Sequence, residues 1–300
     1  MKRKLIKQGK GSLTISLPKE WIDYHELNPG DSIDVNEEGN DLVIKSDSKK
    51  TLKGTEIKLD YQSKESYRSL IGSLYRGGYD IINVKFDDNK ILDNLQKAVE
   101  SIYGFELMYI EKDSCVIKSI YDKERTEIKS HIKRIIYTVK TIQKIIIDDI
   151  NDGEFDSFSQ IQKLRDNVLK NRDLIIRVIK KQKLLDNSNF PYYTITLSLW
   201  GVVRNYYKMY ENLEGLFIDD KSIELLNETN NYVKKLFSNI DSLNKDDFLK
   251  RHNLYENVYE LALDCIKNKK INSLIPSFCL NIIIDSQLSD SYTYLLNHKD

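Results

Sequence analysis

Cationic side chains are concentrated at the N-terminal end of this chain. The first 19 residues contain no aspartate or glutamate, whereas the 300-residue chain as a whole has 46 basic and 46 acidic residues. The cations of this segment are Lys2, Arg3, Lys4, Lys7, Lys10 and Lys19. Clustered ammonium and guanidinium groups neutralise phosphates and release their counterions, so the asymmetry indicates a polyanionic partner. A solvated basic tail is the alternative interpretation of the same charges.

Residues suited to catalysis or metal binding form no motif. The sequence has no P-loop, no GxGxxG after a strand, no GxSxG and no kinase signature. The four histidines are far apart, and Cys115, Cys265 and Cys279 include no CxxC pair. We therefore expect a protein that is not an enzyme, has no catalytic residues and needs no metal or other cofactor. Cysteines without a pairing pattern fit a reducing cytoplasm. The sequence lacks a long apolar run, which predicts a soluble, unexported chain without membrane insertion.

Residues 4–46 should form a small β-rich module that carries the cations. Leu13, Ile15 and Leu17 alternate with serine and threonine, which predicts a strand with one buried and one polar face. Pro18 ends this strand and suits the first turn of a short helix. The remaining expected elements are a turn at 28–31, a strand at 32–35, a hairpin turn at 38–41 and a strand at 42–44.

A module of this size needs additional stabilisation. About 45 residues bury little apolar surface alone, and domains near that size usually depend on a metal, disulfides or a partner chain. The module has no cysteine, so we predict that it forms a homodimer. The polar stretch at 46–50 is expected to be a linker.

Residues 55–120 alternate between strand and helix patterns. This order predicts an α+β segment, with helices packed on one antiparallel sheet. Gly77, Gly78 and Gly104 stand where the two helices should end. The strands are expected at 55–59, 81–86, 107–111 and 115–119, and the helices at 64–76 and 91–103.

From about residue 122 the pattern is helical. Apolar residues between Ile128 and Ile146 recur at three- and four-residue steps, which is typical of an amphipathic bundle helix. Short polar breaks favour antiparallel neighbours, and we expect a pair of three-helix bundles. The six expected helices span 122–150, 154–186, 191–217, 219–240, 244–268 and 272–297.

The N-terminal module resembles a known family. Gly11-Ser-Leu-Thr-Ile-Ser-Leu-Pro-Lys-Glu-Trp21, followed by Leu27-Asn-Pro-Gly-Asp31, is similar to the swapped-hairpin DNA-binding domains of the AbrB/SpoVT/MazE family. The resemblance implies an intertwined homodimer that contacts DNA through a β face and basic loops. The residues predicted to bind DNA are Lys2, Arg3, Lys4, Lys7, Gln8, Lys10, Ser12 and Thr14.

The helical half resembles the PhoU family, and the combination of parts resembles archaeal phosphate uptake regulators. The likeness lies in Leu164-Arg-Asp166 with Asn171-Arg172-Asp-Leu-Ile-Ile-Arg177, and in residues 290–297. It implies three domains. These are an AbrB/SpoVT-like DNA-binding and dimerisation domain at 1–48, an α+β middle domain at 52–120 and a PhoU-like helical domain at 121–300.

The chain departs from the PhoU pattern at the metal sites. PhoU proteins usually carry Glu/Asp-xxx-Asp pairs that hold iron or zinc clusters. Here the second-helix pair is Asn167 with Asn171, or at best Asp166 with Lys170, and Tyr207 stands where the third helix should carry an acid. We therefore expect these clusters to be lost or reduced to a weak site. The remaining acidic residues are expected to be solvated or salt-bridged, and they are Asp148, Asp149, Asp166, Asp173 and Glu211.

Two pairs of basic residues on the helices are open to two interpretations. Arg172 with Arg177, and Arg204 with Lys208, would suit a phosphate-binding or partner-binding surface. Basic residues at such spacings are commonly solvent-facing on bundle helices, and we favour that interpretation.

Three functions remain. The first is a cytoplasmic, homodimeric transcription regulator that binds DNA through the N-terminal module and receives a signal, connected with phosphate supply, through its helices. The second is an adaptor whose helices dock on a phosphate transporter or a signalling protein such as a sensor kinase, with the N-terminal module serving mainly for dimerisation. The third is an antitoxin-like partner. It ranks last because antitoxins usually carry a short disordered segment in place of about 180 helical residues.

Overall fold

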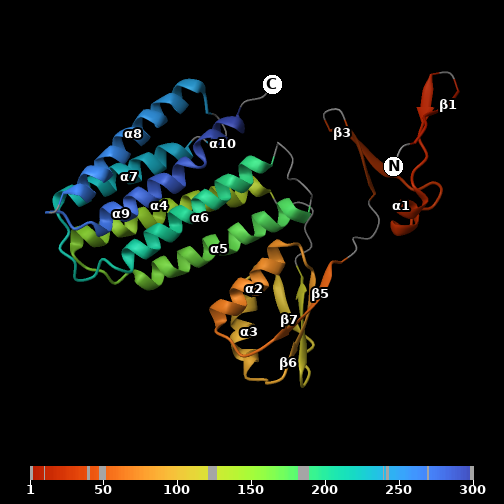
Figure 1. Cartoon of the computed structure of the whole chain (residues 1–300), viewed down its shortest axis with the longest axis horizontal. Helices are drawn as coiled ribbons and strands as arrows, with labels where there is room; N and C mark the ends of the chain where they lie inside the picture. Colours follow the sequence, from red (N-terminus) through yellow and green to blue (C-terminus); the bar gives the residue numbers. More distant parts are fainter. Residues whose placement is uncertain are drawn as a thin grey trace. The chain divides into compact units, whose positions relative to one another are not determined.

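The chain forms two compact units, Met1–Leu52 and Lys53–Asp300 (Figure 1). The computed structural model describes residues 3–9, 11–38, 41–46, 52–120, 127–181, 189–238, 240, 243–268 and 270–297. Each unit is considered by itself.

The first unit consists of two β-hairpins and one short helix. Strands β1 and β2 are antiparallel, and the turn between them has positive φ at Gly9 (70°) and Gly11 (99°), which explains both glycines. The expected turn at 28–31 is present: the Asp31 amide donates to the Asn28 carbonyl at 3.0 Å, and Gly30 has φ 101°. The elements are β1 Ile6–Gln8, β2 Ser12–Thr14, α1 Lys19–Tyr24, β3 Ile33–Glu38 and β4 Asp41–Ser46.

The first unit has no buried core of its own in the part that the structure describes. None of its described residues is buried, and Leu13 is 60% exposed. Val35 and Ile44 are direct partners in the β3–β4 ladder, so they share one face of that hairpin. Leu42 lies on the same face and is 59% exposed. The buried face expected for these strands is therefore uncovered in a single chain.

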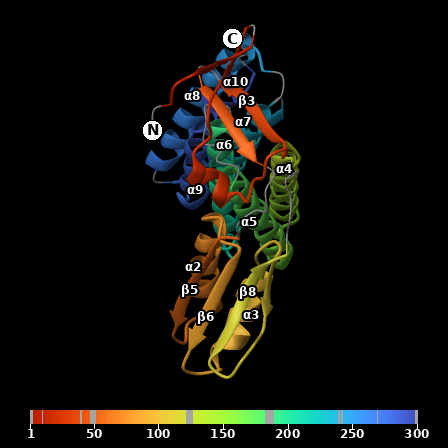
Figure 2. The same ribbon diagram turned by 90° about the vertical axis from the view of Figure 1, so that its right-hand side faces the viewer.

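The second unit begins with an α+β layer. Helices α2 and α3 lie on one face of a four-stranded sheet with strand order β5-β6-β8-β7 (Figures 1 and 2). Strands β5 and β6 are parallel, which corrects the expected antiparallel sheet. The reason is the connection through α2, because a strand–helix–strand crossover returns the chain in the same direction. The elements are β5 Gly54–Leu59, α2 Lys64–Arg76, β6 Ile81–Phe86, α3 Ile91–Glu100, β7 Phe105–Met108 and β8 Ser114–Ser119.

Long helices make up the rest of the second unit. Helices α4, α5 and α6 pack on one another, as do α7, α8 and α9, and α6 packs along α9 (Figure 1). One hydrophobic core runs through both groups, and a separate core lies between the sheet and its two helices. The bounds are α4 Ile128–Asp152, α5 Phe158–Lys181, α6 Phe190–Tyr210, α7 Asp220–Ser238, α8 Lys245–Lys267, α9 Leu274–Gln287 and α10 Asp290–Leu295.

The last helix expected from the sequence is two helices. Residues 272–297 divide into α9 and α10, with a break at Leu288 and Ser289. The Ser289 hydroxyl donates to the Ser286 carbonyl at 2.8 Å, and a serine that bonds to its own backbone competes with helix continuation. Asp290 then stands in the first turn of α10, where a negative charge stabilises a helix.

Among the described residues, no helix combines the length and the apolar character needed to cross a membrane.

Candidate nucleic-acid interface

The β1–β2 hairpin carries most of the residues predicted to bind DNA. In its register Gln8 stands opposite Ser12, and Thr14 stands opposite Ile6, so these side chains share one face. Lys7 stands opposite Leu13 on the other face. The hairpin therefore brings the neutral residues together and separates them from Lys7.

The two hydroxyl groups of this face already donate within the hairpin. The Ser12 hydroxyl donates to the Gln8 carbonyl, and the Thr14 hydroxyl donates to the Ile6 carbonyl at 3.2 Å. A hydroxyl that donates in this way can still accept hydrogen bonds through its lone pairs. Ser12 and Thr14 thus fix the hairpin, and only Gln8 offers an unengaged side-chain donor on this face within the described residues.

The cations of the hairpin region are exposed. Arg3, Lys4 and Lys7 are all accessible to solvent, and none of them forms an ion pair within residues 3–9, 11–38 and 41–46. Lys2 and Lys10, which belong to the same predicted set, lie outside the described residues. Acidic side chains of the first unit begin only at Glu20, so the positive charge of the hairpin is not balanced nearby in sequence.

An apolar hollow lies beside the helix of the first unit. It has a volume of about 240 Å³ and is lined mainly by Leu17, Ile22, Leu27, Pro29 and Ile33. Sequence alternation predicted that Leu17 lies on a buried face, but it could not reveal that a single chain leaves this region uncovered. Exposed apolar surface of this kind is typical of a site that contacts another protein surface.

The acidic residues of the helices engage neighbouring side chains. Asp166 pairs with Arg165 at 2.6 Å, and Glu211 pairs with Lys208 at 2.6 Å. Asp149 accepts from the Tyr210 hydroxyl. Among the described residues, no three His, Cys, Asp or Glu side chains come together as a metal site would need.

The residues that replace the expected metal ligands have structural roles. Asn171 lies 2.7 Å from Nδ1 of His131, and its own amide donates to the Asn167 carbonyl. Tyr207 is buried beneath Arg165, whose guanidinium lies 4.3 Å from the ring centre. These neutral side chains therefore join helices through hydrogen bonds and ring packing.

The three cysteines are buried and unpaired. Burial raises the pKa of the Cys115 thiol to about 11 and that of the Cys279 thiol to about 12. Both thiols stay protonated near neutral pH, and a protonated thiol is a poor nucleophile.

The expectation that Arg172 and Arg177 face solvent is wrong. Arg177 is 4% exposed and pairs with Asp80 at 2.5 Å, while Arg172 pairs with the buried Asp173 at 2.6 Å. Both lie where α5 meets the α+β layer, and the partner of Arg177 is 97 residues away in sequence, which spacing on α5 could not identify. Arg204 and Lys208 are exposed, as expected.

A comparison with known families gives one match, at the N-terminus. The family model described as "Antidote-toxin recognition MazE, bacterial antitoxin" matches residues 6–52. Neither the curated proteins nor the solved structures give a match. The first unit is therefore a MazE/AbrB-like domain, and it is followed by a mostly helical region. The matched segment ends before α2, so the PhoU-like character of the helices and the archaeal origin stay predictions.

Proposed function

We propose that this chain is a DNA-binding transcription regulator that acts as a homodimer through its first unit. The observation that carries the proposal is the β1–β2 hairpin of a MazE-like domain with exposed cations that have no ion-pair partner in the described part of that unit. Lysine and arginine side chains in this state are available for phosphates, and their binding is driven by counterion release.

Dimerisation is supported by the surface that a single first unit leaves open. Leu13, Val35 and Leu42 are more than half exposed, and the apolar hollow lies in the same unit. A second copy of the unit would cover such surfaces, which small domains without a core cannot leave in water. Two copies would also present two basic hairpins to one duplex, and this symmetry suits half-sites on DNA.

The second unit would then receive the signal or bind a protein partner. Its size and its two hydrophobic cores support a folded sensing or docking module. A connection with phosphate uptake rests on the resemblance of the helices to PhoU alone. If the connection holds, DNA occupancy in cells should differ between phosphate-rich and phosphate-poor growth.

The experiment is a measurement of duplex DNA binding at two salt concentrations. The intact chain is compared with a Lys2/Arg3/Lys4/Lys7/Lys10→Ala variant. The intact chain should bind tightly with a steep salt dependence, and the variant should lose about 0.9 units of slope for each phosphate contact removed.

A matched control removes the same number of cations from the other unit. Lys58, Lys85, Lys90, Lys97 and Lys208 are exposed lysines of the second unit, and their replacement by alanine should leave the salt slope unchanged. Weak binding by both the intact chain and the hairpin variant would instead favour the adaptor, in which the first unit only dimerises.

One further candidate has a specific observation behind it. The description of the matched family names toxin recognition, so a second candidate function of the first unit is to bind a toxin. Mixing the purified chain with a MazE-recognised toxin tests this directly. A stable stoichiometric complex would support the antitoxin function. If the chain acts only as a transcription regulator, no such complex should form.

A further inference from the structure

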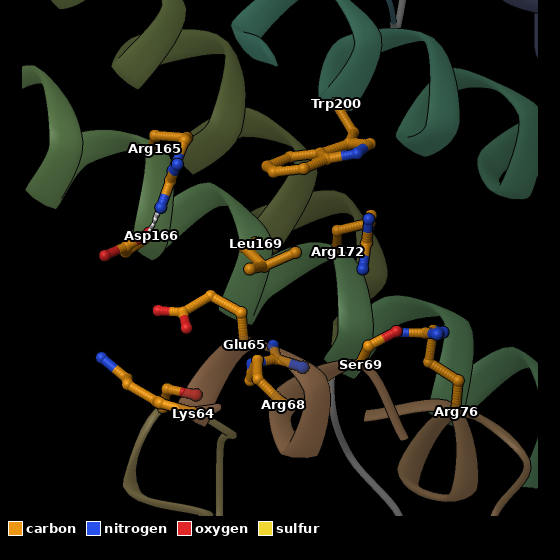
Figure 3. Close-up of a pocket in the computed structure, with 11 residues that line it drawn as sticks. Lys64, Glu65, Arg68, Ser69, Arg76, Arg165, Asp166, Leu169, Arg172 and Trp200 are labelled. Atoms are coloured by element: carbon orange, nitrogen blue, oxygen red, sulfur yellow. Dashed lines mark hydrogen bonds and ion pairs between the residues drawn. The ribbon is translucent and has the colours of Figure 1, made fainter. Parts of the chain in front are cut away.

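A basic cavity lies in the second unit, where α2 meets α5 and α6. Its volume is about 460 Å³. Figure 3 shows Arg68 and Arg76 on α2 facing Arg172 on α5, with Trp200 of α6 above them. Five cationic and two anionic side chains line the cavity, the remaining cations being Lys64 and Arg165.

Three of the arginines converge on one carboxylate beneath the cavity. Asp173 is completely buried, and it pairs with Arg68 at 2.5 Å, with Arg76 at 3.0 Å and with Arg172 at 2.6 Å. A single carboxylate offsets only one of these three charges. With Asp173 included, the lining keeps an excess of two positive charges.

The arginines exceed what a structural ion pair between α2 and α5 would need. Arg68 Nε is buried and has no hydrogen-bond partner among the described residues. Burial lowers the pKa of Arg172, and the neighbouring charges of Arg76 and Arg68 lower it further, against the attraction of Asp173. Like charges held together in this way are stabilised when an anion joins them.

A glycine on α2 makes room for the arginine cluster. Gly72 lies one turn from both Arg68 and Arg76, and a Cβ atom at this position would lie 2.3 Å from Nη1 of Arg68 and 3.3 Å from Nη1 of Arg76. Any larger residue would therefore require the Arg68 guanidinium to move from this position. The spacing Arg68, Gly72, Arg76 lets both side chains fold over the same turn toward Asp173.

An aromatic ring forms the wall opposite α2. The guanidinium of Arg172 lies 4.8 Å from the centre of the Trp200 ring, and Trp200 lines the cavity. This cation–π contact helps to orient Arg172. A wall of this kind also offers an apolar surface to the organic part of a ligand.

We propose that this cavity binds the phosphate group of a small phosphorylated molecule. A phosphate dianion matches the excess of two positive charges, and guanidinium groups donate paired hydrogen bonds to phosphate oxygens. The volume exceeds that of a phosphate ion and leaves room for an attached organic group beside Trp200. The site is separate from the DNA-binding hairpin, so it supplies a place for an effector.

The full-length chain with Trp21→Phe is suited to the test. The sequence has two tryptophans, so this background makes Trp200 the sole source of tryptophan emission. Titration with inorganic phosphate and with ATP, followed by Trp200 fluorescence and by calorimetry, measures the affinity for each. We expect saturable binding that Arg76→Gln weakens about tenfold or more, since each charge-assisted hydrogen bond contributes a factor of that order.

Three further variants separate binding from folding. Gly72→Ala removes no charge and favours the helix, yet it should weaken binding about tenfold because it displaces Arg68. Arg204→Gln removes an exposed arginine of α6 outside the cavity and should leave affinity unchanged. The alanine variant of the N-terminal cations should also keep full affinity, since those residues belong to the other unit.

The two probes identify the source of the phosphate. Equal affinities for phosphate and ATP would mean that the phosphate group alone accounts for binding to the cavity. Tighter ATP binding that Trp200→Ala abolishes would assign a nucleotide. Absence of saturable binding to both probes, or equal affinity in Arg76→Gln, Gly72→Ala and the intact chain, would overturn the proposal without affecting DNA binding by the first unit.

Discussion

Arg177 and Asp80 connect the two hydrophobic cores of the second unit. Nη2 of Arg177, on α5, lies 2.5 Å from Oδ1 of Asp80, which precedes β6. Arg177 also donates to the carbonyl groups of Tyr75 and Tyr79, and Lys181 pairs with the same carboxylate at 2.5 Å. The ion pair is almost fully buried, so neither partner has water as an alternative.

Asp80→Ala should therefore lower the free energy of unfolding of the second unit by about 3–5 kcal/mol, because it leaves a buried guanidinium without its counter-charge. The amide of Lys53 would lose its acceptor as well, since it donates to Asp80 at 3.0 Å. Urea unfolding followed by circular dichroism measures the change.

A matched control is the exposed pair of Lys85 and Glu56, whose ends are 2.9 Å apart on neighbouring strands. Glu56→Ala should cost less than about 1 kcal/mol, because both side chains are more than half exposed. A loss of similar size in the two variants would show that burial of the Arg177 pair contributes nothing.

Most elements of this fold could be predicted from local pattern, but strand β1 and the division of residues 272–297 into α9 and α10 were not. Leu13 and Ile15 alternate with polar residues, and the apolar stripe of α4 repeats at helical spacing, so type and approximate bounds followed from periodicity. The direction of β5 relative to β6 did not follow, because it depends on the crossover through α2.

The partners of the buried charges could not be predicted in this way. Asp80 and Arg177 are 97 residues apart in sequence, and Arg68 is 105 residues from Asp173. Residue spacing on α5 made Arg172 and Arg177 look solvent-facing, since it carries no information on what packs against the helix. The sequence signal for the cavity was the four-residue spacing of Arg68, Gly72 and Arg76. This spacing indicates a binding site only once α2 is known to pack against α5.

Asp285 gives the second unit a specific dependence on pH. Burial raises the pKa of this carboxyl, against the charge of Arg204 and a hydrogen bond from Asn205. Because the pKa of Asp285 is higher in the folded state than in the unfolded state, the folded protein binds this proton more tightly. The stability that the proton contributes is fully present below the unfolded-state pKa of about 3.9, and it is lost as the pH rises through the folded-state pKa. Ionisation of Asp285 thus costs stability at neutral pH.

Asp285→Asn should be more stable than the parent at neutral pH, and the difference should disappear near about pH 3. The gain should be modest, because the side chain is partly solvent-exposed. Urea unfolding across this pH range measures it. Asp93→Asn, at an exposed aspartate paired with Lys97, should bring no gain, and an Asp285→Asn advantage that grows on acidification would contradict the assignment.

Close packing between α6 and α9 depends on a glycine at Gly201. A Cβ atom there would lie 2.4 Å from Oδ2 and 2.6 Å from Cγ of Asp285. Gly201→Ala should lower the free energy of unfolding by about 1–3 kcal/mol through overpacking, although alanine is the better helix former by about 1 kcal/mol.

A double-mutant cycle isolates this contact. In an Asp285→Ala background the carboxylate is absent and only the contact with the Cβ atom of residue 285, at 3.1 Å, remains, so Gly201→Ala should cost much less there. Thermal and urea unfolding of the four proteins give the coupling. Additive effects of the two substitutions would mean that the glycine is needed for a different reason.

The apolar face of the β3–β4 hairpin should decide the oligomeric state. Val35 and Leu42 lie on this face and are more than half exposed in a single chain, whereas Asn36 lies on the opposite face. Val35→Glu with Leu42→Glu would place two charges in the proposed dimer contact, where an unpaired charge is strongly unfavourable. Light scattering after gel filtration should show the mass falling from twice 35.2 kDa to 35.2 kDa.

Asn36→Glu is the matched control, because it adds the same charge to the other face of the same strand and should leave the dimer intact. The monomeric variant should also bind duplex DNA much more weakly, since two linked hairpins bind with an effective concentration that one hairpin lacks. A dimer that survives both glutamates would place the contact elsewhere. A monomer that still binds DNA as tightly as the parent would show that each hairpin acts alone, and the symmetric arrangement proposed for the regulator would then be wrong.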